Sequence, residues 1–281
     1  MIPRLDYQDS LSPTTLQFLE LLARSAFRGD IEKSYASRLA MATDNSVYQV
    51  VPQAVLYPRS ADDIAVMLKL AQGPEYATLS FFPRGGGTGT NGQSLTDGIV
   101  VDLSRHMNKI LEINVEERWV RVQAGTVKDQ LNAALKPHGL FFAPELSTSN
   151  RATVGGMINT DASGQGSCTY GKTRDHVLEL DMVLRGGERL HGAALAEEDL
   201  TALCAREDRV GEVYRCARQI IDEQGELIKQ RFPDLNRCLT GYDLAHLREA
   251  DNRFNLNSVL CGAEGSLGFV VEARLNVLPI P

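Results

Sequence analysis

The chain has 281 residues, a formal net charge of −7 and an isoelectric point near 5.3, with 43% hydrophobic and 23% charged residues. This length accommodates one large domain or two small subdomains, and the composition excludes a disordered, fibrous or repetitive chain. The acidic balance offers no basic stripe for counterion release, which argues against a nucleic-acid partner, so any bound anion must be held locally.

No apolar run approaches the roughly 20 residues of a membrane-spanning helix, and residues 1–6 lack the apolar core of a signal peptide. We therefore predict a cytoplasmic protein, and peripheral contact at the inner face of the membrane stays open. The five cysteines are widely spaced, and no Cys-x-x-Cys pair indicates zinc or an iron–sulfur cluster in this chain. They are interpreted as reduced thiols: Cys168, Cys204, Cys216, Cys238 and Cys261.

The first part of the chain predicts a helix followed by a small α/β unit. The helix is expected to begin after the N-cap Ser12 and to end at Gly29. A short strand at 55–57 leads to a second helix, capped by Ser60, and another strand covers 78–83. This strand–helix–strand order predicts a small α/β subdomain whose second strand delivers the chain into a glycine-rich loop.

The remainder is expected to be rich in strands. A helix at 127–136 is stopped by Pro137 and Gly139, and the polar, acidic stretch 195–230 is interpreted as a surface helical insertion outside the active site. Strands are expected at 98–103, 110–114, 119–124, 177–184 and 268–278, with a hairpin joining the second and third and a hairpin turn following the fourth.

The glycine loop at 84–94 is the most informative segment. It places five glycines within eight residues, which sacrifices backbone entropy without any gain in packing. Such a loop exposes successive backbone N–H groups to phosphate oxygens, and hydroxyl donors stand at Thr88, Thr90 and Ser94. It formally matches the Rossmann glycine pattern, but it runs on into a strand instead of opening a helix, and no lysine follows as in a P-loop. The alternative is a long hairpin loop that happens to be rich in glycine.

A second unusual segment covers residues 144–171, where small and hydroxylated side chains predominate. Such a stretch packs a core poorly but brings amides and hydroxyls close to a flat polar heterocycle, such as an isoalloxazine ring. A loose surface loop is the alternative, and the embedded Val154, Met157 and Ile158 argue against it.

Four motifs follow one another along the chain, at 83–88, at 124–127, at 153–156 with Ala162, Gly164, Tyr170, Gly171 and Asp175, and at 262–268. Their order resembles the FAD-binding domain of the vanillyl-alcohol oxidase and p-cresol methylhydroxylase (PCMH) type, in its FAD-linked oxidase branch. Residues 150–151 and 240–244 further resemble a subgroup, the fused flavin and iron–sulfur D-2-hydroxyacid dehydrogenases of the YdiJ type.

The resemblance implies a set of cofactor-binding residues, in which Arg84 to Thr90 wrap the pyrophosphate, the second segment approaches the flavin, and Glu264 and Gly265 close the site. The implied set is Pro83, Arg84, Gly85, Gly86, Gly87, Thr88, Gly89, Thr90, Asn91, Ser94, Pro144, Ser147, Thr148, Thr153, Val154, Gly155, Gly156, Asn159, Ala162, Ser163, Gly164, Tyr170, Gly171, Glu264, Gly265, Gly268, Phe269 and Val270.

Two departures from the family pattern concern the attachment of FAD. Relatives that bind FAD covalently have a histidine after the glycine run, where this chain has Thr88, and the cysteine of doubly linked relatives is absent around 150–152. The resemblance therefore implies non-covalent FAD. It also implies that a C-terminal cap domain, absent from this chain, supplies the substrate, metal and base residues, and that an iron–sulfur cluster belongs to the full-length protein and not to this chain.

The implied reaction is the oxidation of a D-2-hydroxyacid, with D-2-hydroxyglutarate as the first candidate and D-lactate or glycolate as the second. Hydride transfer to FAD requires a nearby base, and His176 is the best placed histidine, although a structural role is the more common one at a strand start. Arg151 is the first arginine to test for bidentate binding of the substrate carboxylate. The alternative role for this arginine is a salt bridge or a phosphate contact. Asp161 and Glu145 are a further candidate, as an acid/base pair, but the sequence neither fixes their separation nor indicates that either carboxyl is held protonated. The catalytic residues therefore stay unassigned. His106, His138, His191 and His246 have no supporting context.

We expect an α+β fold of the PCMH type, in which two α/β subdomains hold FAD between them. The expected division is an N-terminal helical segment at 1–29, a small subdomain at 30–103 and a larger mixed-sheet subdomain at 104–281. This chain alone should hold FAD but turn over poorly, with an unidentified electron acceptor. Two alternatives are an electron-transfer or assembly module without its own substrate, and an enzyme of the same fold with other chemistry, such as an NADPH-dependent cell-wall reductase or an alkyl-glycerone-phosphate synthase.

Overall fold

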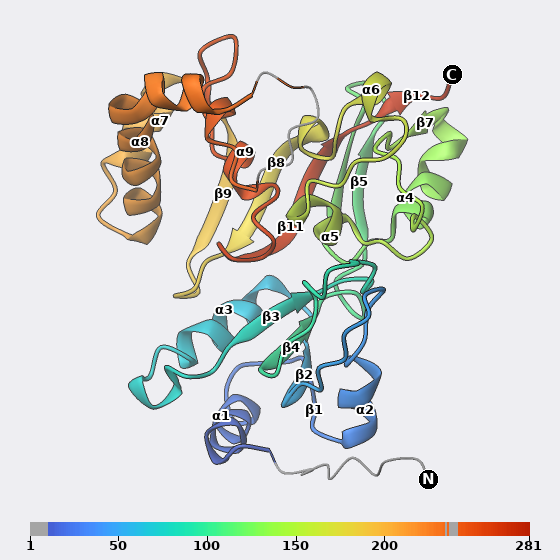
Figure 1. Ribbon diagram of the computed structural model, residues 1–281, viewed down its shortest axis with the longest axis vertical. Coiled ribbons are helices and arrows are strands. Elements are labelled where there is room, and N and C mark those ends of the chain that lie inside the picture. The colour runs from blue at the N-terminus through green and yellow to red at the C-terminus, as the bar shows by residue number, and fades with distance from the viewer. Residues whose placement is uncertain (1–10, 234, 236–240) are drawn as a thin grey trace.

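The computed structural model describes residues 11–233, 235 and 241–281, which form two lobes stacked along the long axis of the molecule (Figure 1). Each lobe combines helices with a sheet, so the α+β class is confirmed. The predictions made for residues 1–6, Cys238 and Thr240 concern residues outside the described ranges.

The lower lobe in Figure 1 contains a four-stranded sheet in the order β1-β2-β4-β3. Strand β4 runs parallel to both of its neighbours, and β1 is antiparallel to β2. The strands are β1 (Asp30–Glu32), β2 (Ala54–Tyr57), β3 (Phe81–Arg84) and β4 (Ile99–Asp102), and the helices are α1 (Pro13–Ala23), α2 (Tyr35–Ala40), α3 (Ala61–Leu70) and the 3₁₀ turn η1 (Pro74–Tyr76).

The upper lobe contains a six-stranded antiparallel sheet in the order β10-β9-β8-β11-β6-β5. These strands are β5 (Ile110–Asn114), β6 (Trp119–Gln123), β8 (Val177–Val183), β9 (Arg189–Leu195), β10 (Phe254–Asn255) and β11 (Phe269–Asn276); a separate pair joins β7 (Leu140–Phe141) to β12 (Leu278–Pro279). Its helices are α4 (Lys128–Leu135), α5 (Val154–Asn159), α6 (Ser167–Tyr170), α7 (Glu197–Cys204), α8 (Arg209–Arg231) and α9 (Asn257–Leu260), with 3₁₀ turns η2 (Lys136–His138), η3 (Arg174–His176) and η4 (Leu244–His246).

Local sequence signals explain most element boundaries. The hydroxyl of Ser12 accepts from the N–H of Thr15 at the start of α1, and Ser60 caps α3 in the same way through Asp63. The prediction that α1 ends at Gly29 is wrong, because the helix ends at Ala23. The side chain of Ser25 bonds to the carbonyl of Leu22 at 2.7 Å and terminates the helix earlier.

The glycine loop connects β3 to β4, and these strands are parallel neighbours. The hairpin alternative is therefore wrong, because a hairpin joins antiparallel strands. No helix lies between the two strands, which confirms that the loop is not of the Rossmann type. The hairpin between β5 and β6 and the turn between β8 and β9 are confirmed as predicted.

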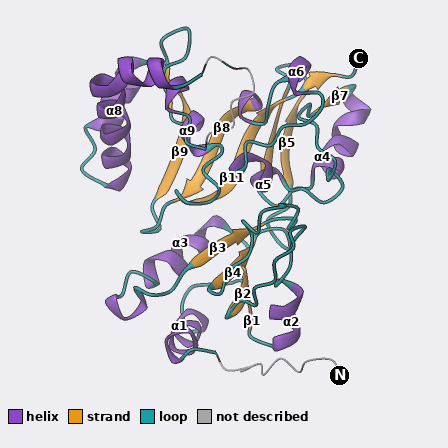
Figure 2. Cartoon of the chain, viewed as in Figure 1, coloured by secondary structure: helices purple, strands orange, loops and turns teal. Residues whose placement is uncertain are grey.

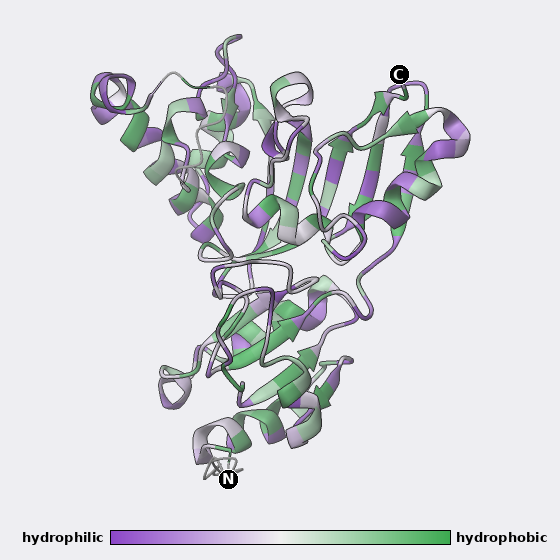
Figure 3. Cartoon of the chain, turned by 45° about the vertical axis from the view of Figure 1, so that its right-hand side comes forward, coloured by the Kyte–Doolittle hydropathy of each residue, from purple (hydrophilic) through white to green (hydrophobic). Residues whose placement is uncertain are grey.

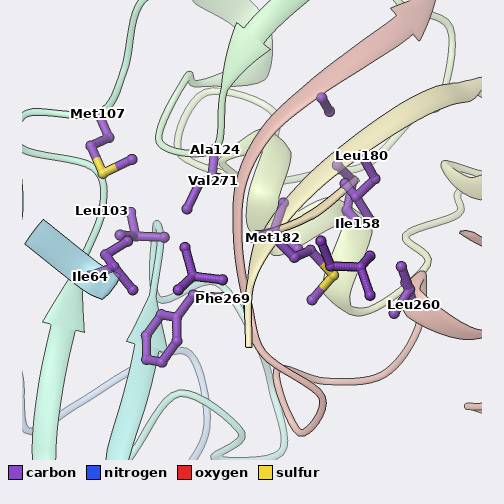
Figure 4. Packing of buried hydrophobic residues seen from close by; sticks show 14 of the residues in the cluster. Ile64, Leu103, Met107, Ala124, Ile158, Leu180, Met182, Leu260, Phe269 and Val271 are labelled. Atoms are coloured by element: carbon purple, nitrogen blue, oxygen red, sulfur yellow. The ribbon is translucent and has the colours of Figure 1, made fainter. Parts of the chain in front are cut away.

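One large hydrophobic core extends through both lobes, and a second, small cluster in the lower lobe contains Val55, Tyr57 and Val100. Figure 4 shows Ile64 of α3 and Leu103 close to Phe269 and Val271 of β11, where the lobes meet. In the large sheet, apolar and polar bands alternate along the strands (Figure 3), so that one face packs inward and the other carries charge. The predicted insertion forms α7 and α8, and it is docked to the sheet by the buried Tyr214, whose hydroxyl donates to the carbonyl of His191 at 3.0 Å.

Candidate functional site

Loops from both lobes converge between the two sheets (Figure 2). Residues of these loops line a cavity of about 370 Å³, a volume in the range of small-molecule and cofactor sites. Its walls come from the glycine loop of the lower lobe and from three parts of the upper lobe, around Ala124, 146–163 and 264–270. Segments far apart in the sequence therefore form one site.

The cavity is lined by much of the cofactor-binding set implied by the resemblance. The lining members of that set are Pro83, Arg84, Gly85, Gly86, Gly87, Thr88, Gly89, Thr90, Ser94, Thr148, Thr153, Gly155, Gly156, Asn159, Ala162, Ser163, Glu264, Gly265 and Val270. Members that do not line it are Asn91, Pro144, Ser147, Val154, Gly164, Tyr170, Gly171, Gly268 and Phe269. Among these, the side chains of Val154 and Phe269 are buried in the core, and Tyr170 packs edge-on against Phe141.

The glycine loop offers hydrogen-bond donors that the protein itself does not use. Within the described residues, none of the backbone N–H groups from Gly85 to Thr90 donates a hydrogen bond. Gly87 has a positive φ of 60°, which turns the chain as expected for a nest of N–H groups. Because unpaired N–H groups beside a cavity favour an anionic oxygen, this donor set fits the diphosphate of a dinucleotide.

The loop also packs against the second segment at backbone distance. A Cβ atom at Gly85 would lie 2.1 Å from Oγ1 of Thr153, and one at Gly86 would lie 2.1 Å from the carbonyl oxygen of Arg151. Any larger residue would therefore separate the two walls. These glycines are required for the close approach that forms the cavity.

Arg84 lines the cavity, but its guanidinium bonds elsewhere. It donates to the carbonyls of Met41 at 3.2 Å and Thr43 at 2.6 Å, and it lies 3.4 Å from the carbonyl of Ser94. The side chain is buried, and burial lowers the pKa of the guanidinium while the charge of Asp102 raises it. Arg84 therefore fixes the base of the loop to the segment that precedes β2.

The second segment contains α5, a helix that the sequence analysis did not predict. Thr153 caps it by accepting from the N–H of Gly156 at 3.3 Å, and the N–H of Gly155 donates to the carbonyl of Ala124 at 2.7 Å. A Cβ at Gly155 would lie 2.8 Å from the Cβ of Ala124. The family motif at 124–127 thus serves as the surface on which α5 rests.

A turn at 262–265 forms the last wall. The N–H of Glu264 donates to the carbonyl of Asn159 at 2.8 Å, and the side-chain oxygen of Asn159 accepts from the N–H of Gly265 at 3.1 Å. The amide of Asn159 also donates to the carbonyl of Gly155 at 2.9 Å. Asn159 therefore joins the turn to α5.

Several lining residues were missed by the sequence analysis. Ala124 lies in a family motif and Gln93 lies in the glycine loop, so their positions alone could have indicated them. The other missed residues are apolar or lie between motif positions, and the sequence contained no signal for them. The missed residues are Gln93, Leu103, Ala124, Leu146, Ala152, Met157 and Thr160.

The candidate catalytic residues lie outside the cavity lining. His176 is buried, its Nε2 lies 2.7 Å from the carbonyl of Tyr170, and its ring packs edge-on against Phe142, which favours the structural role. Asp161 is buried and its Oδ2 lies 2.6 Å from Nζ of Lys172, which favours a structural ion pair for this carboxylate. Arg151 is exposed, and its side chain makes no ion pair within the described residues.

Three of the other described histidines lie beside a carboxylate. His106, His191 and His246 each lie 2.7 Å from a carboxylate, and these are Asp30, Asp181 and Asp243. No group of three or more metal-ligating side chains occurs in the ranges that the structure describes. Over the same ranges, no helix is both long and apolar enough to cross a bilayer. Cys168, Cys204, Cys216 and Cys261 are free thiols.

Comparison with known proteins adds to this geometry. Residues 52–192 match a family model described as an FAD binding domain. A Pseudomonas putida protein named D-2-hydroxyglutarate dehydrogenase is 73% identical over 265 residues, which cover 94% of this chain and 26% of that protein. An Escherichia coli protein of the same name is 53% identical over 282 residues and is covered to 28%.

More distant matches include one by sequence and one by structure. The Bacillus subtilis glycolate oxidase subunit GlcD is 31% identical over 254 residues, which cover 90% of this chain and 43% of that protein. A solved structure of alkyldihydroxyacetonephosphate synthase superimposes with a TM-score of 0.64 at 18% identity, covering all of this chain and 42% of the other, and this likeness shows the fold alone. The chain spans about a quarter of the length of the dehydrogenases it matches.

Proposed function

Because the chain belongs to the family of FAD binding domains, we propose that the cavity between its lobes holds FAD non-covalently, in a protein that oxidises a D-2-hydroxyacid. The first candidate substrate is D-2-hydroxyglutarate, after the name of the relatives with 53–73% identity. D-lactate and glycolate are the second candidates. The cofactor-binding residues, the division into subdomains and the cytoplasmic location stay predictions.

The observation that carries the proposal is the row of unused N–H groups from Gly85 to Thr90 beside the cavity. These groups would hold the diphosphate, and the hydroxyls of Thr88 and Thr90 would add donors. No histidine or cysteine stands among the described residues that line the cavity, which supports non-covalent attachment.

When bound, FAD supplies a hydride acceptor for the substrate carbon. The residues of this chain would bind and orient FAD. Thr153 and Gly155 line the cavity from the second segment, and Glu264 and Gly265 line it from the turn at 262–265. Since His176 and Asp161 lie outside the lining and are held by other partners, we place the base and the substrate carboxylate contacts beyond this chain. The electron acceptor is left unassigned, and an iron–sulfur cluster is proposed only for the longer protein.

A titration of this chain with FAD tests the cofactor proposal. We expect quenching of flavin fluorescence with one FAD bound per chain, and release of all yellow colour on acid denaturation. Failure to bind FAD, or colour that stays with the denatured polypeptide, contradicts it.

The substrate proposal is tested on the longer protein under anaerobic conditions. We expect D-2-hydroxyglutarate to bleach the 450 nm absorbance that is typical of oxidised flavin, and NADPH to leave it unchanged. Bleaching by NADPH, or by no hydroxyacid at all, favours one of the two alternative functions.

A further inference from the structure

The turn at 262–265 has a backbone that is unfavourable for one of its residues. Gly262, Glu264 and Gly265 have positive φ angles of 84°, 51° and 77°. Glycine adopts this region freely, whereas a residue with a Cβ is strained there by about 1–3 kcal/mol. Such strain clusters at functional sites, which directs attention to the glutamate.

The turn fixes Glu264 at the junction of the cavity walls. Its N–H bonds to Asn159 at 2.8 Å, and the next residue, Gly265, is so close to Pro83 that a Cβ there would lie 2.8 Å from the proline ring. Glu264 is thus held between α5 and the start of the glycine loop. Its side chain lines the same cavity as that loop.

Glu264 is the single acidic side chain among the described residues that line the cavity. Within the described part of the chain, its carboxylate makes no hydrogen bond or ion pair. Glu264 is exposed to solvent by its accessible surface, and its partial enclosure by the cavity raises the pKa of its carboxyl. Water, and no cation of the described chain, is therefore the partner of the carboxylate when the cavity holds no ligand.

The titratable groups on the neighbouring elements already bond to other parts of the protein. The guanidinium of Arg84 bonds to Met41 and Thr43, and Asp161 is paired with Lys172. The hydroxyl of Tyr242 lies 2.6 Å from the hydroxyl of Ser266. None of these groups neutralises a negative charge at Glu264.

We propose that Glu264 takes up one proton from solvent when a diphosphate-bearing ligand fills the cavity, so that the binding of FAD depends on pH. This proposal rests on the proposed function. A diphosphate carries negative charge, and a carboxylate that shares a partly desolvated cavity with it is repelled. Protonation removes the repulsion: one O–H bond forms at the carboxyl, no other bond changes, and the neutral acid becomes a hydrogen-bond donor.

The sign of the effect follows from linkage. Ligand binding stabilises the protonated carboxyl, so the affinity for FAD is highest below the pKa of Glu264 and falls as the pH rises through it. A further rise of one unit on binding corresponds to about a tenfold difference in affinity between low and high pH. In Glu264→Gln, which is neutral throughout, this dependence is lost and affinity at high pH exceeds that of the unmodified chain.

Calorimetric titration with FAD, in two buffers that differ in heat of ionisation, measures the proton uptake directly. For a rise of one unit we expect a maximum uptake of about half a proton per FAD for the unmodified chain, at a pH midway between the pKa values of Glu264 without and with FAD, and none for Glu264→Gln. Glu116→Gln, which removes an exposed carboxyl from the β5–β6 turn, is the matched control and should retain the uptake.

A second variant separates charge from backbone strain. Glu264→Gly relieves the positive φ and should raise the melting temperature while also abolishing proton uptake. Arg118→Gly relieves a similar φ of 58° away from the cavity, and it should raise the melting temperature with the uptake intact. Tight, pH-independent FAD binding by the unmodified chain overturns this inference alone, whereas absence of FAD binding by every variant overturns the proposed function as well.

Discussion

Substitution of Gly86 by alanine tests the idea that the two cavity walls meet at backbone distance. The new Cβ would lie 2.1 Å from the carbonyl oxygen of Arg151, against an ordinary C···O contact of about 3.3 Å. The walls must then separate by roughly 1 Å, because the opposing atom belongs to the backbone and cannot rotate away.

The substitution should lower both the folding stability and the affinity for FAD. Overpacking of this kind costs about 1–3 kcal/mol of folding stability. A shift of roughly 1 Å also removes at least one N–H contact to a charged phosphate, which is worth about 1.5–3 kcal/mol, so the affinity for FAD should fall about ten- to a hundredfold.

Quenching of flavin fluorescence gives the dissociation constant, and thermal melting without FAD gives the stability. The matched control is Gly225→Ala in the middle of α8, where no atom lies within 4 Å of the added Cβ. That variant should gain about 1 kcal/mol from helix propensity and bind FAD normally. If Gly86→Ala melts and binds FAD like the unmodified chain, the close packing of the glycine loop is refuted.

Other predictions concern charge and reactivity. In the proposed site, neutral N–H groups face the diphosphate and the guanidinium of Arg84 bonds to protein carbonyls, so raising NaCl from about 0.1 to 0.5 M should weaken FAD binding less than about threefold, as measured by fluorescence titration; a steep salt dependence contradicts this proposal. Asp161→Asn or Lys172→Met strands one partner of a buried ion pair and should cost about 3–5 kcal/mol in urea denaturation, with the double variant recovering part of the loss. Thiol alkylation followed by mass spectrometry should label the exposed Cys168 in the native chain but Cys261 only after unfolding, because burial raises the pKa of Cys261; rapid native labelling of Cys261 argues against its burial.

The sequence predicted those parts of the fold whose signals are local. Ser60 marked the start of α3, and the segment 119–124 was predicted as the strand that is β6, because capping and strand propensity act within a few neighbours. The glycine loop was identified from its composition. Its parallel flanking strands were not, because strand direction is set by contacts between segments.

The site was predicted only where its signals are local. Helix α5 was missed because Gly155 and Gly156 lower helix propensity, and it forms through the Thr153 cap and the burial of Val154 and Ile158. The hydrogen bonds from Arg84 to carbonyls before β2 could not be predicted, because the sequence around Arg84 does not indicate which distant carbonyls accept from its guanidinium.

The unbroken apolar packing between the lobes has a consequence for how the protein acquires its flavin. Ile64, Phe269 and Val271 belong to this core and do not line the cavity, so part of the apolar contact that joins the lobes lies away from the ligand site. A newly synthesised chain should reach its final shape while flavin is scarce and load it afterwards. Loading and exchange then require rearrangement of the surface loops alone, and a cell short of riboflavin would accumulate folded protein ready to be filled.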